Sequence, residues 1–67
     1  MKVVEKIKND IQEISEPFEM AGYLDMIKMS AALYCKQNCP DEVIFENGLL
    51  KDITISGIVD FLNSEAE

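Results

Sequence analysis

The sequence has no histidine, and it has only three glycines, two prolines and two cysteines among its 67 residues. Without histidine, no Ser-His or Cys-His pair can form within the chain, and nucleophilic catalysis of that kind is excluded. The glycines, Gly22, Gly48 and Gly57, are scattered and cannot form a glycine-rich loop that cradles a phosphate. The carboxylates are spread along the chain and make no calcium-binding loop. We therefore predict that the chain is not an enzyme and holds no cofactor.

Basic residues are also few, with six Lys and Arg against thirteen Asp and Glu, which gives a net charge of −7. Such a chain repels phosphates and anionic lipids, so neither nucleic-acid binding nor membrane binding is expected. No apolar run approaches the ~18 residues that span a bilayer, and the first residues lack the apolar core of a signal peptide. The composition, 48% hydrophobic and 28% charged, is that of a folded domain. We predict one small helical domain, residues 1–67, in the cytoplasm.

The two cysteines, Cys35 and Cys39, are four residues apart. This spacing differs from the Cys-x2-Cys pattern of zinc sites, and no histidine can complete a ligand set. A disulfide between them would close a tiny loop and would be strained within a helix. We predict two structural thiols and no metal site, as is usual in a reducing compartment.

Apolar spacings of three and four residues predict a first helix that ends by about Ser15, before Pro17. Its apolar stripe consists of Val3, Val4, Ile7, Ile11 and Ile14. A second helix is predicted from about Phe18 to Asn38, with Pro17 in its first turn. Its apolar arc is wide, which indicates a central helix packed on two sides. Gly22 interrupts the pattern, and the alternative is a loop at 18–22 with the helix starting near Tyr23.

Residues 40–53 allow two interpretations. Pro40 and the acids after it suit a helix start and Gly48 suits a helix end, which predicts a short helix over residues 41–47. Alternatively, Asn47-Gly48 is the favoured two-residue turn of a β-hairpin over residues 43–52. A last helix is predicted from about Thr54 to Glu65, with Thr54 or Asp52 as its cap. Its predicted inward face is Ile55, Ile58, Val59 and Leu62, with Phe61 beside it. The predicted fold is an all-α bundle of three to four helices, and the alternative is α+β with the hairpin.

A cluster of adaptable side chains lies near the start of the central helix. Methionine recurs at binding surfaces because its side chain is flexible and polarisable. Met26 and Met29 lie close to Tyr23 and Asp25 in the sequence. We predict Tyr23, Asp25, Met26 and Met29 as partner-binding residues, while the simpler interpretation makes the methionines core residues.

Three stretches together resemble acyl carrier proteins. These are the Leu-Asp that opens LDMIKMSAAL at residues 24–33, the Pro-Asp-Glu at 40–42, and TISGIVDFL at 54–62. The family attaches a phosphopantetheine arm to the serine of an Asp-Ser-Leu motif. Gly22-Tyr23-Leu24 stands in that place here, so the resemblance implies a carrier-like protein without the arm. It also implies that Asp25 lies on the face with which carriers meet their partners.

The residues themselves predict a small acidic helical module that binds another protein, as an adaptor, inhibitor or regulator. Excess negative charge speeds the encounter with a basic surface, so a protein with a basic face is the expected partner. The small core also suggests a homodimer, since a chain of this length buries only about 60% of its unfolded surface. The alternative function is that of a degenerate acyl-carrier-like protein without the phosphopantetheine site.

Overall fold

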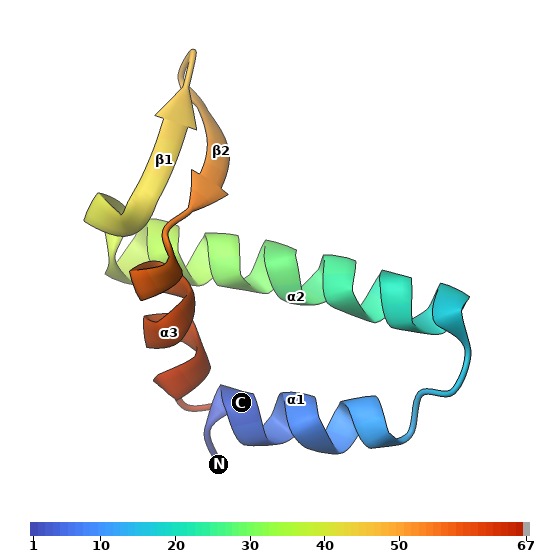
Figure 1. Cartoon of the computed structure of the whole chain (residues 1–67). Helices are drawn as coiled ribbons and strands as arrows, with labels where there is room; N and C mark the ends of the chain where they lie inside the picture. The colour runs from blue at the N-terminus through green and yellow to red at the C-terminus, as the bar shows by residue number, and fades with distance from the viewer. Residues whose placement is uncertain (67) are drawn as a thin grey trace.

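The computed structural model describes residues 1–66 of the chain. Two helices, α1 (Val3–Gln12) and α2 (Pro17–Asn38), lie side by side and run in opposite directions (Figure 1). A single 3-10 turn (Pro40–Glu42) leads into a hairpin of β1 (Val43–Glu46) and β2 (Leu49–Ile53), and α3 (Ile55–Asn63) follows. In Figure 1 the hairpin projects from one end of α2, while α3 connects that end to α1.

The first two helices confirm the predicted pattern. Pro17 occupies the first turn of α2, where its missing N–H has no helical partner in any case. The helix runs through Gly22 without a break, so the alternative of a loop at 18–22 is wrong. The apolar stripe of α1 forms one half-buried face, although no residue of α1 is fully buried.

The predicted all-α bundle is wrong, because residues 43–53 form an antiparallel hairpin, as in the α+β alternative. Asn47 and Gly48 both have positive φ, 55° and 78°. Positive φ at both central residues is the geometry of a type I′ turn, whose twist matches that of the two strands of a hairpin. A lone hairpin is marginal in water, but this one is anchored on the helices. Val43 is buried, and the Thr54 N–H donates to the carbonyl of Glu42 at 2.9 Å. Tertiary packing therefore supplies the stability that the hairpin lacks on its own.

The core is small and lies where α3 crosses the C-terminal half of α2. Its buried apolar side chains are Ala31, Cys35, Val43 and Phe61. The predicted inward face of α3 is wrong, because Ile55 is 81% exposed and Val59 is 47% exposed. The face formed by Gly57 and Phe61 is buried instead.

Gly57 explains why α3 buries this face and not the predicted one. A Cβ at Gly57 would lie 2.7 Å from Ile53 Cγ2 and 2.9 Å from Glu42 Cβ. Only glycine therefore allows the first turn of α3 to approach the hairpin and α2 this closely. The aliphatic residues of α3 were predicted to face inward because they are hydrophobic. Hydrophobicity does not indicate where a helix backbone must lie close to a neighbouring segment, as at Gly57.

Candidate protein-binding faces

The predicted partner-binding residues do not form one cluster. Successive helical residues are about 100° apart around the axis, and the structure divides the four between two hollows. Tyr23 and Met26 line a hollow of about 420 Å³ between α1, α2 and the end of α3. Asp25 and Met29 line a hollow of about 520 Å³ between α2, β2 and α3. We call these the α1–α2 hollow and the hairpin hollow.

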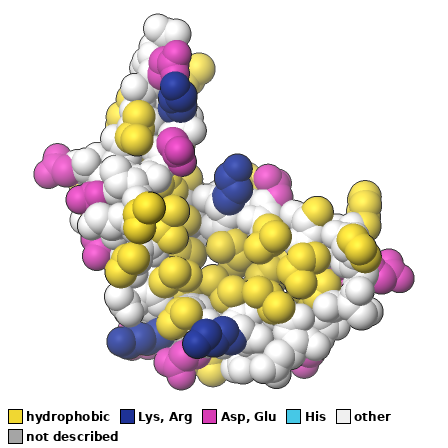
Figure 2. Space-filling model, viewed as in Figure 1, with side chains coloured by type: hydrophobic (Ala, Val, Ile, Leu, Met, Phe, Trp, Pro, Cys, Tyr) yellow, Lys and Arg dark blue, Asp and Glu magenta, His cyan; other side chains and the backbone are white. Residues whose placement is uncertain are grey.

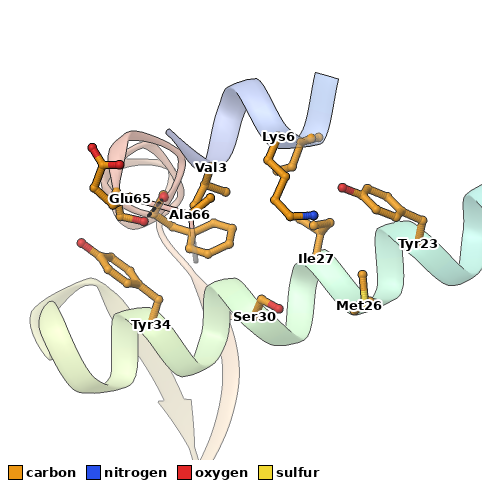
Figure 3. A pocket seen from close by; sticks show the side chains of 12 residues that line it. Val3, Lys6, Tyr23, Met26, Ile27, Ser30, Tyr34, Glu65 and Ala66 are labelled. Atoms are coloured by element: carbon orange, nitrogen blue, oxygen red, sulfur yellow. Dashed lines mark hydrogen bonds between the residues drawn. The ribbon is translucent and has the colours of Figure 1, made fainter. Parts of the chain in front are cut away.

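The α1–α2 hollow is mostly apolar, with polar groups at its edges (Figure 3). Its apolar lining comes from Val3, Ile7, Tyr23, Met26, Ile27, Tyr34, Phe61 and Ala66. Tyr34 and Phe61 form its wall near α3, with ring centroids 5.7 Å apart. Lys6, Ser30, Ser64 and Glu65 supply the polar edge. This arrangement suits apolar side chains that arrive from outside with polar flanks.

A hydrogen-bonded group ties α1 to α2 at one side of this hollow. The Tyr23 hydroxyl donates to Asp10 Oδ2 at 2.8 Å, and Lys6 Nζ donates to the same oxygen at 2.9 Å. The hydrogen bond from Lys6, and to a smaller extent that from Tyr23, lowers the pKa of Asp10 below its usual value. Burial, together with the Asp10 carboxylate, raises the pKa of Tyr23 to about 12. The Tyr23–Asp10 hydrogen bond therefore links the two helices at this side of the hollow.

The predicted resemblance to acyl carrier proteins would put Tyr23 in the place of their attachment serine. The Tyr23 hydroxyl is bound to Asp10 and remains protonated, so it is not poised as a nucleophile. Asp25, the residue that matched the carrier recognition face, is exposed on α2 and lines the hairpin hollow.

Negative charge is concentrated at the end of the molecule where α1 turns into α2. Residues 9–27 hold five acids, Asp10, Glu13, Glu16, Glu19 and Asp25, and no lysine or arginine. The three glutamates are exposed, and we call them the acidic end. Figure 2 shows a broad apolar area on this face, bordered by both acidic and lysine side chains, with further acidic side chains at the right edge.

Phe18 is the apolar residue that sequence reasoning missed. It lies in the first turn of α2 between Glu16 and Glu19, and it is 89% exposed. Its exposure follows from where α1 and α3 leave α2 uncovered, which the local sequence does not indicate. Exposed aromatic side chains with charged neighbours are frequent anchors in protein interfaces.

The thiols are placed for packing. Cys35 is fully buried, and its Sγ donates to the Gly57 carbonyl at 3.3 Å. Burial raises the pKa of Cys35 to about 11, which keeps this thiol protonated at neutral pH. Neither Cys35 nor Cys39 is in a disulfide. Among residues 1–66, no group of three or more His, Cys, Asp or Glu side chains could hold a metal ion.

No helix within the described part of the chain has the length and apolar character needed to cross a bilayer. Comparisons of the chain with protein-family models, with curated proteins and with solved structures gave no match. The residues and their geometry are therefore the basis for assigning a function.

Proposed function

We propose that this chain is a small acidic module that binds another protein, as an adaptor, inhibitor or regulator, through the α1–α2 hollow and the acidic end. The observation that carries the proposal is the position of an apolar hollow of about 420 Å³ next to the acidic end, where Glu13, Glu16 and Glu19 are exposed. Asp10 of the same segment is paired with Lys6 at the edge of the hollow. An apolar recess with exposed charge beside it is a usual form of protein-binding surface.

The partner is defined by complementary chemistry. Apolar side chains of the partner would occupy the hollow, because Ile7, Ile27 and Phe61 offer them a dry surface. Lysine or arginine residues next to those side chains would face Glu13, Glu16 and Glu19. The charge of −7 disfavours nucleic acid and favours a basic protein surface, whose approach it would accelerate. Two free thiols suit a reducing compartment, and we place the protein in the cytoplasm.

Serine residues on two helices offer a matched test. Ser30 is exposed and lines the α1–α2 hollow, whereas Ser56 is exposed on α3 and lines neither hollow. Ser30→Arg places a positive charge in the hollow, where it repels a basic partner, and Ser56→Arg makes the same change in charge elsewhere. Immobilised wild type and the Ser56→Arg variant should retain the same partner, and Ser30→Arg should lose it.

Salt provides a second criterion. At about 1 M salt the screening length falls to about 3 Å, so binding through the acidic end should weaken strongly. Equal retention by the Ser30→Arg and Ser56→Arg variants would refute the proposal, provided that circular dichroism shows both to be folded.

A further inference from the structure

Helix α2 is apolar around most of its circumference, whereas the apolar residues of α1 and α3 lie mainly on one side. A helix with apolar residues all round is normally covered all round. Here α1, α3 and the hairpin cover only part of α2, and five of its large apolar side chains are exposed. Leu24, 49% exposed, lies on another side of the helix, and the other four face outward together. They are Phe18, Met26, Met29 and Leu33, with exposed fractions of 89%, 54%, 62% and 61%.

These residues and Gly22 form a continuous outer stripe along α2. The successive separations, from Phe18 through Gly22, Met26 and Met29 to Leu33, are four, four, three and four residues. Separations of three and four residues keep side chains on one face of a helix, and such a face can pack along another helix. A Cβ at Gly22 would meet no atom within 4 Å, so packing within the chain gives no reason for a glycine there. A neighbouring helix would use this position for close approach.

The surface area of the chain indicates how much the missing contact would cover. The described residues expose 5170 Å². A compact monomer of 7.6 kDa would expose about 4300 Å² by the usual scaling of surface with mass. The excess, about 900 Å², includes exposed surface of the projecting hairpin as well as of α2, and it is close to the ~800 Å² that each partner buries in an interface of standard size. The radius of gyration, 12.8 Å, likewise exceeds the ~11 Å of a compact chain of this length.

Charges along α2 identify the occupant. The N-terminal half of the helix carries Glu19 and Asp25, with Glu16 as its N-cap, whereas Lys28 and Lys36 lie in the C-terminal half. A parallel copy of α2 would bring like charges together. An antiparallel copy would bring the acidic half of each helix to the basic half of the other, and a two-fold axis would satisfy both halves at once.

We propose that a second copy of this chain packs antiparallel along the outer stripe of α2. Full overlap of the helix Pro17–Asn38 with its copy sets Glu19 opposite Lys36 of the second copy. The same register sets Gly22 opposite Leu33, which places the largest aliphatic residue of the stripe against its smallest member. Met26 and Met29 meet near the two-fold axis. In this dimer Met26, which also lines the α1–α2 hollow, would pack against the second copy, and the rest of the hollow, Ser30 included, would remain open.

Sedimentation equilibrium of the full chain tests the inference, with a dimer of twice the 7.6 kDa chain mass expected. Leu33→Asp should raise the dimer dissociation constant by at least about 100-fold, because it places a charge against Gly22 of the second copy at two symmetry-related points of the seam. Leu49→Asp is the matched control, since Leu49 is 73% exposed at the hairpin turn and off the stripe. A wild type that stays monomeric to about 0.5 mM, or equal masses for the two variants, would overturn the inference.

Charge reversal tests the direction and register of the pairing. Glu19→Lys alone and Lys36→Glu alone should each weaken the dimer by about tenfold, because each disrupts two symmetry-related pairs. The double variant should restore wild-type association, since the pairs are re-formed with their signs exchanged. Failure of the double variant to recover would rule out the antiparallel register.

The dimer and the proposed function can fail separately. Ser30→Arg should leave the dimer intact, and Leu33→Asp should leave binding at the α1–α2 hollow intact. The inference would be contradicted if the wild type were monomeric and bound some other protein that the Leu33→Asp variant no longer bound. The outer stripe would then be the binding site for that protein.

Discussion

The same substitution, glycine to alanine, should have opposite effects at Gly57 and Gly22. In a helix interior alanine is favoured over glycine by about 1 kcal/mol. At Gly22 the added methyl group meets nothing within 4 Å, so the full gain should appear as increased stability. At Gly57 the methyl group would lie 2.7 Å, 2.9 Å and 3.2 Å from atoms of Ile53, Glu42 and Cys35. Overpacking of this kind costs about 1–3 kcal/mol, and two of these contacts are too short for any side chain to tolerate without movement.

We therefore expect Gly57→Ala to destabilise the chain by up to about 2 kcal/mol after the gain in helix propensity, and Gly22→Ala to stabilise it by about 1 kcal/mol. Urea unfolding followed by far-ultraviolet circular dichroism measures both. Each substitution is made in the Leu33→Asp background, so that self-association does not contribute. A Gly57→Ala variant at least as stable as its parent would refute the account of how α3 packs.

Three further predictions concern single side chains. Thr54→Ala should destabilise α3 by about 1–2 kcal/mol in urea unfolding, because Thr54 Oγ1 accepts from the Gly57 N–H and donates to Glu42; Thr54→Ser should retain most of that stability. Cys35, with its pKa raised from 9.0 to about 11, should react with iodoacetamide about 100-fold more slowly in the folded chain than in urea at pH 8. Its contribution to stability should be complete below pH 9 and should be lost as the pH rises through 11, a loss that Cys35→Ala should remove. Ultraviolet titration should show a tyrosine transition near pH 12 that Tyr23→Phe abolishes, and a transition unchanged in that variant would contradict the Tyr23–Asp10 hydrogen bond.

Local sequence signals were sufficient for the helices and insufficient for the hairpin. Proline at residue 17 and the three-and-four spacing of α1 act within one or two turns, and both predictions are confirmed. For residues 43–53 the local signals favoured a helix and a hairpin almost equally. The outcome depended on burial of Val43 and on the backbone bond from Thr54 to Glu42, which join segments distant in the chain.

The prediction of the partner-binding site was also limited by the difference between local sequence signals and three-dimensional arrangement. Tyr23, Asp25, Met26 and Met29 are neighbours in sequence, but the helical rotation between them assigns them to two hollows. That separation could have been read from the 100° step alone. The exposure of Phe18 could not have been predicted from the sequence, because it depends on where α1 and α3 leave α2 uncovered.

Photo-cross-linking at the α1–α2 hollow tests the proposed function most directly, because it detects contact between the hollow and a partner protein. A photo-reactive phenylalanine derivative replaces Ser30 in one variant and Ser56 in another, and both are irradiated in the cells that produce the chain. We predict a cross-link from Ser30 to a protein other than this chain, through a segment that combines apolar residues with lysine or arginine, and no such cross-link from Ser56. Cross-links from Ser56 alone, or the same products from both positions, would contradict the claim that this hollow receives the partner.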